Sequence, residues 1–324
     1  MGFWTDKKVL LAGGAGFIGS HVADVLLDRG ARVSVADRPT IGFPKNLEHV
    51  KHDIELIPTD LFDLTDVRAV CRGQEIIFCL AARTGGIDFN KRHPGIVFRD
   101  SVRMSLNMLE AARLEELERA LVVSSSCVYS QEAPEPTPES AGFLGDPEGA
   151  NFGYGWAKRF AEIQARTYAE EFGMNIAITR PYNGYGPRDH FDPAISHVVA
   201  ALIKRVIDGD DPVVVWGDGE QIRTFLYVKD FARGLVETCE KYAVCDPLNI
   251  GSSEETKIKD LAEMIVRLSG RPAHLKFDTS KPGGQPRRTC DMTKAREKIG
   301  FTTEYTLEAG LRETIEWYAA EFGS

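Results

Sequence analysis

Short apolar runs alternate with helical periods along the first half of the chain, and this alternation constrains the fold more than any other feature. Each apolar run is short and rich in Val, Ile or Leu, which predicts strands at Lys8–Ala12, Arg32–Ala36, Ile54–Ile57, Ile76–Leu80 and Ala120–Val123. Helical periodicity predicts helices at His21–Arg29, Asp63–Cys71 and Val97–Arg113. The pattern therefore predicts an α/β fold with a doubly wound parallel sheet, covered by helices on both faces.

The character of the chain changes near residue 180, where loop residues become frequent. We expect a first domain over 1–180 and a smaller C-terminal α/β lobe over 181–324, with segments around 225–252 returning to the first domain. The remaining predicted elements are helices at Phe152–Phe172, Ile195–Ile207, Asp230–Lys241, Lys257–Leu268 and Leu307–Ala320, and strands at Ile176–Thr179 and Pro212–Trp216.

Composition excludes several classes of partner. Lys plus Arg number 39 and Asp plus Glu 48 among 324 residues, which leaves a net charge of −9. Nucleic acid and anionic membrane surfaces are therefore not expected as main partners. No apolar run approaches about 18 residues and no secretory pattern is present, so no membrane span is expected. The six cysteines lack CxxC spacing, which favours a cytoplasmic chain with reduced thiols. His49 and His52 have no accompanying carboxylate or cysteine cluster, so no metal centre is expected.

Three glycines at a spacing of three follow the first predicted strand and precede the first predicted helix. Gly13 permits a tight turn, Gly16 lets backbone amides approach a pyrophosphate, and Gly19 allows the helix to pack closely on the strand. Phe17 and Ile18 lie between the last two glycines. With a strand before it and a helix after it, the motif predicts dinucleotide binding rather than a purely structural turn.

Acidic residues near the ends of the second and third predicted strands bear on the choice of cofactor. Asp37 can accept hydrogen bonds from both hydroxyls of an adenosine ribose, which favours NAD over NADP. Arg38 is the next residue and can instead bind the 2′-phosphate of NADP, so NADP remains an alternative cofactor. Asp60 and Leu61 are a predicted adenine contact, although an aspartate at such a position is as often a helix cap.

A phenol and an ammonium stand four residues apart on one predicted helix. Tyr154 and Lys158 therefore share a helix face, where the cation lowers the pKa of the phenol and makes it a proton donor and acceptor. The serines at 124–126 follow the fifth predicted strand, at the sheet edge where parallel sheets bind ligands. One of these hydroxyls is expected to serve the same substrate oxygen as the phenol, and spacing alone leaves open which one. An exposed Tyr–Lys pair and a serine-rich turn are the structural alternatives.

These residues belong to a longer set of motifs by which the sequence resembles the extended short-chain dehydrogenase/reductase family that acts on nucleotide sugars. Among its members, the sequence is most similar to the GDP-L-fucose synthases, which are 3,5-epimerase-4-reductases of GDP-4-keto-6-deoxy-mannose. The shared motifs are Gly13–Gly19, Leu80–Ile87, Ser125–Tyr129, Tyr154–Lys158, Arg180–Pro187, Ser196–Val198, Val215–Gly219, Arg223–Phe225 and Ser280–Arg288. The resemblance spans nearly the whole chain and implies a Rossmann domain followed by a nucleotide-sugar-binding lobe.

The resemblance also implies roles for individual residues. It implies catalytic roles for Ser125, Tyr154 and Lys158, and proton transfer by Cys127 and His197. A 4-keto group acidifies the neighbouring C–H bonds, so a thiolate on one face and an imidazole on the other can invert C3 and C5. The other implied contacts are with the cofactor at Leu80, Ala81, Ala82 and Tyr182, and with the substrate at Gly86, Ser126, Asn183, Arg205, Trp216, Arg223, Arg287 and Arg288. Guanidinium groups suit the diphosphate because they bind phosphate oxygens bidentately.

One departure from the fucose synthases leaves the overall reaction open. Those enzymes take a hydride from NADPH, whereas Asp37 resembles the NAD-holding acid of GDP-mannose 3,5-epimerase and of the UDP-hexose 4-epimerases. Net reduction and a redox-neutral epimerisation therefore remain alternatives. A non-catalytic dinucleotide-binding regulator is a third, although such proteins usually lose the Tyr–Lys pair that this chain retains. The resemblance further implies a homodimer through the helices near 97–113 and 152–172.

Overall fold

Seven parallel strands form the central sheet in the computed structural model, which describes residues 2–38, 45–193, 195–281 and 285–323. Their spatial order is β11-β6-β5-β4-β1-β2-β3. The strands are β1 (Lys8–Ala12), β2 (Arg32–Asp37), β3 (Ile54–Pro58), β4 (Ile76–Cys79), β5 (Arg119–Val123), β6 (Ile176–Pro181) and β11 (Leu248–Ile250). The predicted doubly wound parallel sheet is confirmed.

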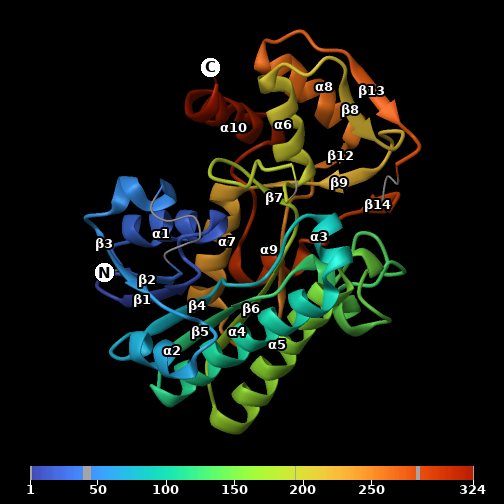
Figure 1. The fold of residues 1–324 in the computed structure, drawn as a ribbon. Coiled ribbons are helices and arrows are strands. Elements are labelled where there is room, and N and C mark those ends of the chain that lie inside the picture. The colour runs from blue at the N-terminus through green and yellow to red at the C-terminus, as the bar shows by residue number, and fades with distance from the viewer. Residues whose placement is uncertain (1, 39–44, 194, 282–284, 324) are drawn as a thin grey trace.

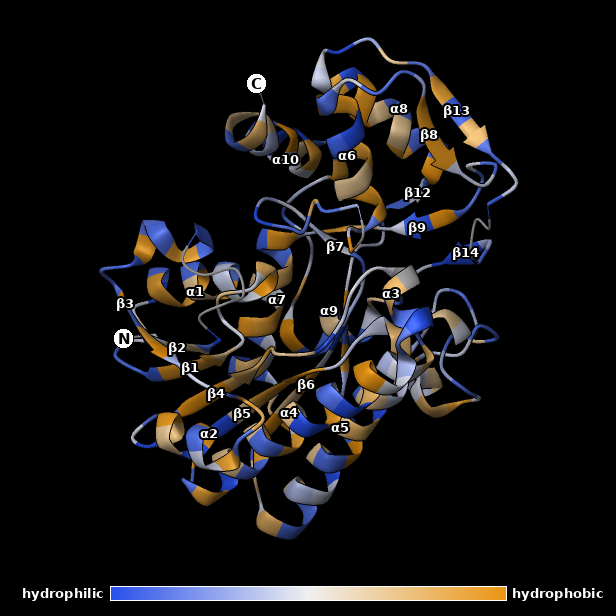
Figure 2. Cartoon of the chain, viewed as in Figure 1, coloured by the Kyte–Doolittle hydropathy of each residue, from blue (hydrophilic) through white to orange (hydrophobic). Residues whose placement is uncertain are grey.

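Helices cover both faces of this sheet (Figure 1). One face carries α1 (Phe17–Asp28) and α7 (Val228–Lys241), and the other carries α2 (Leu64–Cys71), α4 (Pro94–Leu114) and α5 (Phe152–Phe172). Leu11 packs into the core between the sheet and helices α1 and α7. Leu10 packs into the core on the opposite face, under α2, α4 and α5, and both side chains are 0% exposed. The interior strand β4 is buried along its whole length and consists only of apolar residues, and its ribbon is orange in Figure 2.

The strand order reverses beside β1. The chain passes outward from β1 through β2 to β3, then returns across the sheet to β4 on the other side of β1. The backbone amides of Leu80 and Ala81, just after β4, donate to the carbonyl of Ala12 at the end of β1, at 3.0 and 2.9 Å. Parallel sheets bind ligands at such a reversal, outside the carboxyl ends of the strands.

A smaller lobe with its own apolar core lies beyond this edge of the sheet (Figure 1). It contains α6 (Val198–Asp208), α8 (Ile258–Ser269) and α10 (Leu307–Phe322), with β13 (Leu275–Asp278) paired in parallel to β8 (Val213–Trp216). Between lobe and sheet, β9 (Ile222–Thr224) pairs with β12 (Glu255–Lys257) and with β14 (Arg287–Arg288). The other short elements are β7 (Gly184–Tyr185), β10 (Leu226–Tyr227), α3 (Ile87–Arg92) and α9 (Thr293–Ile299).

Some observed boundaries differ from those expected from sequence. The first helix begins at Phe17 rather than His21, because the N-cap is Gly16 and Gly19 lies inside the helix. Likewise α6 begins at Val198 rather than Ile195, after a loop. Within the described part of the chain, no helix combines the length and the apolar character needed to cross a bilayer.

Candidate active site

In the glycine loop between β1 and α1, close packing requires glycine at some positions but not at all of them. Gly13 has φ +89, and a Cβ on it would lie 2.7 Å from the amide nitrogen of Ala81. A Cβ on Gly19 would lie 2.6 Å from the carbonyl oxygen of Gly13, so the fold itself requires both glycines. Gly14, which the sequence reasoning missed, is equally confined by the side chains of Leu11 and Val35.

Gly16 differs from these three, because packing does not require a glycine there. A Cβ on Gly16 would meet only the carbonyl oxygen of Gly13, at an ordinary 3.5 Å. Gly16 is also the N-cap of α1, and as a glycine it provides no side-chain cap for the amides of Phe17, Ile18 and Gly19 that begin the helix. Open space beside uncapped helix amides suits an anion, so the loop fits the pyrophosphate of a dinucleotide.

Asp37 lies beside this loop at the end of β2. Its carboxylate accepts hydrogen bonds from the backbone amides of Ala15, at 3.0 Å, and Arg38, at 2.8 Å. Burial raises the pKa of Asp37, whereas these two hydrogen bonds lower it. The Arg38 guanidinium donates to Asp60 at 2.9 Å and lies 4.3 Å from the ring centroid of Phe62. The carboxylate is therefore fixed at the loop, and the neighbouring cation is already paired.

The other expected cofactor contacts lie around the same strand ends. Leu80, Ala81 and Ala82 follow β4 directly and are half-buried next to Gly13. Leu61 follows β3 and is buried, and its carbonyl accepts a hydrogen bond from Asn107 at 3.1 Å.

Tyr182 is the exception among the expected cofactor contacts. Its side chain is 1% exposed and packs in the core with its ring centroid 6.2 Å from that of Tyr129. The Tyr182 side chain is therefore not open to a ligand in this structure.

Tyr154 and Lys158 point toward the end of β5 from the first turns of α5. The Lys158 ammonium donates to the carbonyl of Val123 at 2.6 Å and lies 5.4 Å from the centroid of the Tyr154 ring. Desolvation lowers the pKa of Lys158 to about 8, because its side chain is only 6% exposed. Burial raises the pKa of Tyr154 above its usual value, the nearby Cys127 raises it further, and a hydrogen bond with Ser125 lowers it. The phenol is therefore protonated at neutral pH, and the lowered phenol pKa that the sequence predicted is not found, because burial is the largest influence on it.

Ser125 and Cys127 meet this pair from the turn after β5. The Cys127 amide donates to the Ser125 hydroxyl oxygen at 3.1 Å, at the start of a 3₁₀ turn over Ser126–Val128. Burial raises the pKa of the Cys127 thiol, whereas Arg288, Ser125 and Lys158 lower it. The structure therefore brings one phenol, one hydroxyl, one thiol and two cations together beside the end of β5.

Helix α5 approaches this turn closely. A Cβ on Gly155 would lie 2.4 Å from the carbonyl oxygen of Cys127, so glycine is required there. Arg159 donates two hydrogen bonds to the carbonyl of Val128, at 3.0 and 2.7 Å. The Ser126 carbonyl accepts a hydrogen bond from Arg288 at 2.5 Å.

The arginines expected near a diphosphate occupy different positions. Arg223 of β9 and Arg288 of β14 are register partners on adjacent parallel strands. Burial and the charge of Arg288 both lower the pKa of Arg223. Arg288 also pairs with Glu148. Arg287 pairs with Glu255 at 2.5 Å, so Arg288 and not Arg287 reaches the turn that carries Cys127.

The remaining expected site residues belong to the smaller lobe and to the loops that face it. His197 is the N-cap of α6, and its side chain reaches solvent. Desolvation by the surrounding protein and the charge of His190 lower the pKa of His197. Arg205 donates to the carbonyl of Val214 in β8, and Trp216 at the end of β8 is 47% exposed. Asn183 donates to the carbonyl of Thr224 at 2.8 Å. Gly86 is buried and is the N-cap of α3. His197 thus lies on a different part of the fold from Cys127.

Two ionised residues that the sequence reasoning missed lie directly behind the site. Glu162 and Arg180 form a fully buried ion pair, and Ser124 donates to Glu162. Glu162 could have been found by extending the α5 face that holds Tyr154 and Lys158 by one more turn. Arg180 could have been found as a charged residue at the end of an apolar strand.

Comparison with known proteins places this arrangement in a family. The model of the NAD dependent epimerase/dehydratase family matches residues 9–251. GDP-L-fucose synthase 1 of Arabidopsis thaliana is 32% identical over 322 residues, which cover 97% of this chain and 94% of the relative. The dTDP-4-dehydro-6-deoxy-D-allose reductase of Streptomyces bikiniensis is 32% identical over 326 residues, with 97% of both chains covered.

Among solved structures, the UDP-glucose 4-epimerase of Thermotoga maritima, determined with UDP-glucose, superposes with a TM-score of 0.87 at 28% identity. The match covers 97% of this chain and 99% of that one. The family match, the relatives and the superposed fold agree with one another. The chain belongs to the NAD dependent epimerase/dehydratase family, the extended short-chain dehydrogenase/reductase enzymes that act on nucleotide sugars.

Proposed function

We propose that this enzyme epimerises a 4-keto nucleotide sugar at C3 and C5 and reduces it at C4, as a GDP-L-fucose synthase does. The observation that carries the proposal is the grouping of Ser125, Cys127, Tyr154 and Lys158 at the carboxyl end of β5, in the same sheet whose strand β1 leads into the glycine loop. A reductase needs the phenol and the ammonium, whereas an epimerase that acts next to a ketone also needs a carbon acid/base. The similarity to fucose synthases over nearly the whole chain supports the same reaction.

Hydride transfer at C4 is the step for which Tyr154 is suited. A dinucleotide whose pyrophosphate is held at the glycine loop would supply the hydride from its nicotinamide ring. The protonated Tyr154 phenol donates a proton to the C4 oxygen as that oxygen gains charge, and the Ser125 hydroxyl hydrogen-bonds to the same oxygen. Lys158 is mostly protonated at pH 7, because its pKa is about 8, and it stabilises the phenolate that remains.

Proton transfer at C3 and C5 is the step for which we propose Cys127 and His197. The adjacent ketone acidifies both C–H bonds, and a thiolate is the active form of cysteine. Burial alone keeps the thiol protonated, but Arg288 and Lys158 both favour the thiolate. His197 has a lowered pKa and is neutral at pH 7, so its imidazole can accept a proton.

We propose that Arg223 and Arg288 bind the diphosphate of the substrate. Two guanidinium groups on neighbouring strands repel each other, and the charge of Arg288 already lowers the pKa of Arg223. A diphosphate between them offsets this repulsion through bidentate hydrogen bonds. Arg205 and the exposed Trp216 extend the proposed nucleotide-sugar site into the smaller lobe.

For the cofactor, Asp37 supports NAD, because its carboxylate at the end of β2 is placed to meet ribose hydroxyls. The ion pair of Arg38 with Asp60 leaves that arginine less free to bind a 2′-phosphate. Retention of NAD favours a second candidate, a redox-neutral epimerase that oxidises and re-reduces the same sugar. NADPH with net reduction favours the fucose synthase reaction.

A turnover assay tests the reductive step. Wild type and Tyr154→Phe are given GDP-4-keto-6-deoxy-D-mannose with NADPH or NADH, and cofactor oxidation is followed by absorbance. We expect Tyr154→Phe to turn over roughly 10²-fold to 10⁴-fold more slowly than the wild type, which is the contribution expected of general acid catalysis. A Tyr154→Phe variant with the wild-type rate would show that Tyr154 is not the general acid. Phe160→Tyr, a change of the same size elsewhere on α5, is the control and is expected to keep the wild-type rate.

We propose two further properties, an assembly and a compartment. Exposed apolar side chains on α4 and α5 support a homodimer through these helices. All six cysteines carry free thiols, which supports a reducing, cytoplasmic compartment.

A further inference from the structure

A buried ion pair lies beneath the turn that carries Ser125 and Cys127. Arg180 of β6 donates to both carboxylate oxygens of Glu162 on α5, through Nε at 2.8 Å and Nη2 at 2.6 Å. The two side chains are 1% and 0% exposed. The Arg180 guanidinium also donates to the carbonyl of Glu139 at 2.7 Å. A Cβ on Gly142 would lie 2.2 Å from the same guanidinium, so the surrounding chain is fitted to it.

Each member of the pair holds one end of the turn. On the near side, the Ser124 hydroxyl donates to Oε1 of Glu162 at 2.5 Å. On the far side, Arg180 donates to the Tyr129 hydroxyl at 3.2 Å, and that hydroxyl donates to Asn249 at 2.5 Å. Ser124 and Tyr129 directly flank the stretch 125–128, so one ion pair fixes both ends of the segment that contains Ser125 and Cys127.

The same ion pair is also tied to the helix that supplies the phenol. Tyr154, Lys158 and Glu162 follow one another at intervals of four on α5, so they lie on one helix face. Glu162 also favours the charged form of Lys158, whose pKa it raises against the effect of desolvation. The pair therefore connects the elements that carry the phenol, the ammonium, the hydroxyl and the thiol.

Stability is a poor explanation for such a pair. Desolvation of two charges offsets most of their attraction, and replacement by packed apolar residues is often neutral or stabilising. A fixed geometry is a better explanation, because an error of about 1 Å in the position of a reacting group can cost roughly 10² in rate.

We propose that Glu162 and Arg180 are positioning residues, which act through Ser124 and Tyr129 to hold Ser125 and Cys127 against Tyr154. This role rests on the proposed function of those three residues. It assigns no contact with substrate or cofactor to the ion pair itself.

Ser124→Ala and Tyr129→Phe test the proposal without leaving a charge buried and unpaired. Each variant removes one hydroxyl that links the ion pair to the turn. With GDP-4-keto-6-deoxy-D-mannose and either NADH or NADPH, whichever the wild type oxidises faster, we expect kcat to fall by about 10-fold to 100-fold. KM and the dissociation constant of the dinucleotide are expected to stay within about 2-fold, because the glycine loop and the arginines are untouched. Thr238→Val is the control, since it removes a buried hydroxyl of α7 and is expected to keep the wild-type kcat.

A double variant separates positioning from a general loss of stability. If Ser124 acts through Ser125 and Cys127, then Ser124→Ala costs less in a Ser125→Ala background than in the wild type, because only the position of Cys127 remains to be lost. A substrate-independent readout is the rate at which iodoacetamide alkylates Cys127, followed by peptide mass spectrometry. We expect this rate to rise at least about 3-fold in Ser124→Ala as the turn loosens, and to stay unchanged in Thr238→Val.

Two results would overturn the proposal. Wild-type kcat and alkylation rate in both Ser124→Ala and Tyr129→Phe would show that the turn is held without the pair. A full additional loss from Ser124→Ala in the Ser125→Ala background would show that Ser124 does not act through Ser125. Failure of the proposed function itself is distinguishable, because Tyr154→Phe would then be as active as wild type.

Discussion

At the scale of the residue, Asp37 shows how one side chain bears on the choice of cofactor. Its two carboxylate oxygens accept amide hydrogen bonds from the glycine loop and from Arg38, so its position is fixed before any ligand arrives. The carboxylate repels a 2′-phosphate and can bind a 2′-hydroxyl. Arg38, the residue best placed to favour NADP, is drawn toward Asp60 and Phe62.

Asp37→Ala is therefore expected to lower the preference for NAD over NADP by roughly 10-fold to 100-fold, the worth of hydrogen bonds to a charged group. Dissociation constants for both dinucleotides, measured by fluorescence titration, give this ratio directly. Asp63→Ala is a suitable control, because Asp63 is a nearby aspartate that caps α2 and is not proposed to contact ribose. An NAD/NADP ratio that does not change in Asp37→Ala would remove this residue from the cofactor site.

Some of the site could be predicted from individual residues, and some could not. The i, i+4 spacing of Tyr154 and Lys158 predicted a shared helix face, and the structure has both side chains near the end of β5. The choice between Arg287 and Arg288 could not be made, because a two-residue strand gives no alternation from which to read its facing side. The buried position of Tyr182 also depends on packing between β6 and β11, which sequence spacing does not reveal.

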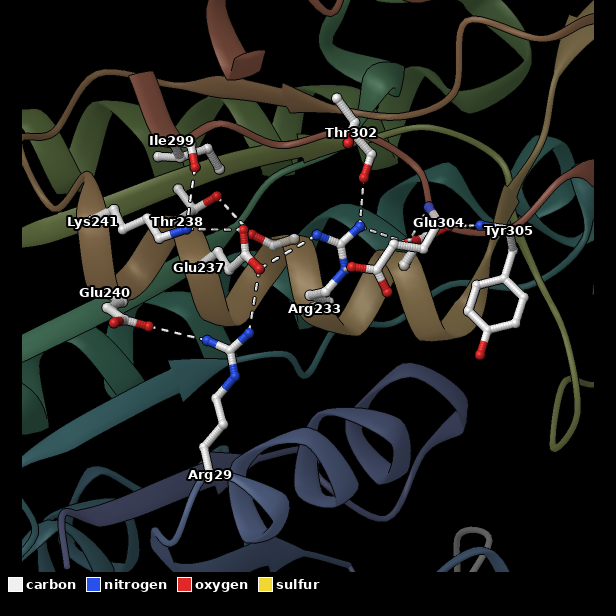
Figure 3. Close-up of polar contacts among 12 residues, drawn as sticks. Arg29, Arg233, Glu237, Thr238, Glu240, Lys241, Ile299, Thr302, Glu304 and Tyr305 are labelled. Atoms are coloured by element: carbon white, nitrogen blue, oxygen red, sulfur yellow. Dashed lines mark hydrogen bonds and ion pairs between the residues drawn. The ribbon is translucent and has the colours of Figure 1, made fainter. Parts of the chain in front are cut away.

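At the scale of the element, α7 is the helix that links the first strands and helices to the C-terminal segment. Arg29 at the end of α1 pairs with Glu237 and Glu240 of α7, at 3.3 and 3.0 Å (Figure 3). Arg233 donates to Asp230 at 2.7 Å and to the carbonyl of Thr302 at 2.5 Å. Helix α7 therefore contacts both α1 and the segment that leads into α10.

Among these residues of α7, Asp230 is the one whose replacement is expected to cost the most stability. It is buried, and its carboxylate accepts hydrogen bonds from the amides of Glu304 and Tyr305, each at 3.0 Å, as well as from Arg233. Asp230→Ala is expected to lower the free energy of unfolding by about 2–4 kcal/mol, because it leaves the amides of Glu304 and Tyr305 without their acceptor, whereas Arg233 keeps the carbonyl of Thr302. Urea denaturation followed by circular dichroism measures this loss.

The matched control is Asp260→Ala. Asp260 is the third residue of α8, as Asp230 is of α7, but it is exposed. Its replacement is expected to change the free energy of unfolding by no more than about 1 kcal/mol. Equal losses in the two variants would contradict the role given to Asp230.

The long elements could be predicted from sequence and the short ones could not. Helix α5 begins and ends where its periodicity predicts, at Phe152 and Phe172. By contrast, β9, β12 and β14 have only two or three residues each, too few to show a strand period. Their pairing depends on contacts between residues far apart in the chain, such as Arg223 and Arg288.

At the scale of the whole molecule, the proposed homodimer rests on apolar side chains at the outer faces of α4 and α5. Phe98, Leu106 and Ile163 are 41%, 42% and 47% exposed, although all three are large and apolar. Gln164 donates to the carbonyl of Leu106 at 3.2 Å, so the two helices present these side chains close together. Apolar surface of this kind on adjacent helices fits a self-complementary interface.

The double variant Leu106→Glu/Ile163→Glu is expected to convert a dimer into a monomer, because four carboxylates would enter one apolar interface. Size-exclusion chromatography with light scattering should report twice the chain mass for wild type and one chain mass for the variant. Val244→Glu changes an apolar residue that is more exposed, at 62%, and lies away from these helices, and this variant is expected to remain dimeric. A wild type that is monomeric at micromolar concentration would contradict the proposed interface.

The central claim is that the Cys127 sulfur moves a proton at a carbon next to the 4-keto group, and solvent exchange tests it most directly. Wild type and Cys127→Ser are incubated in D₂O with GDP-4-keto-6-deoxy-D-mannose and either NADH or NADPH, whichever the wild type oxidises faster, and the sugar is analysed by NMR. Wild type is predicted to incorporate solvent deuterium at the ring carbons, whereas Cys127→Ser is predicted to lose this incorporation and to retain hydride transfer. Unchanged deuterium incorporation in Cys127→Ser would contradict the account and leave only a reductase.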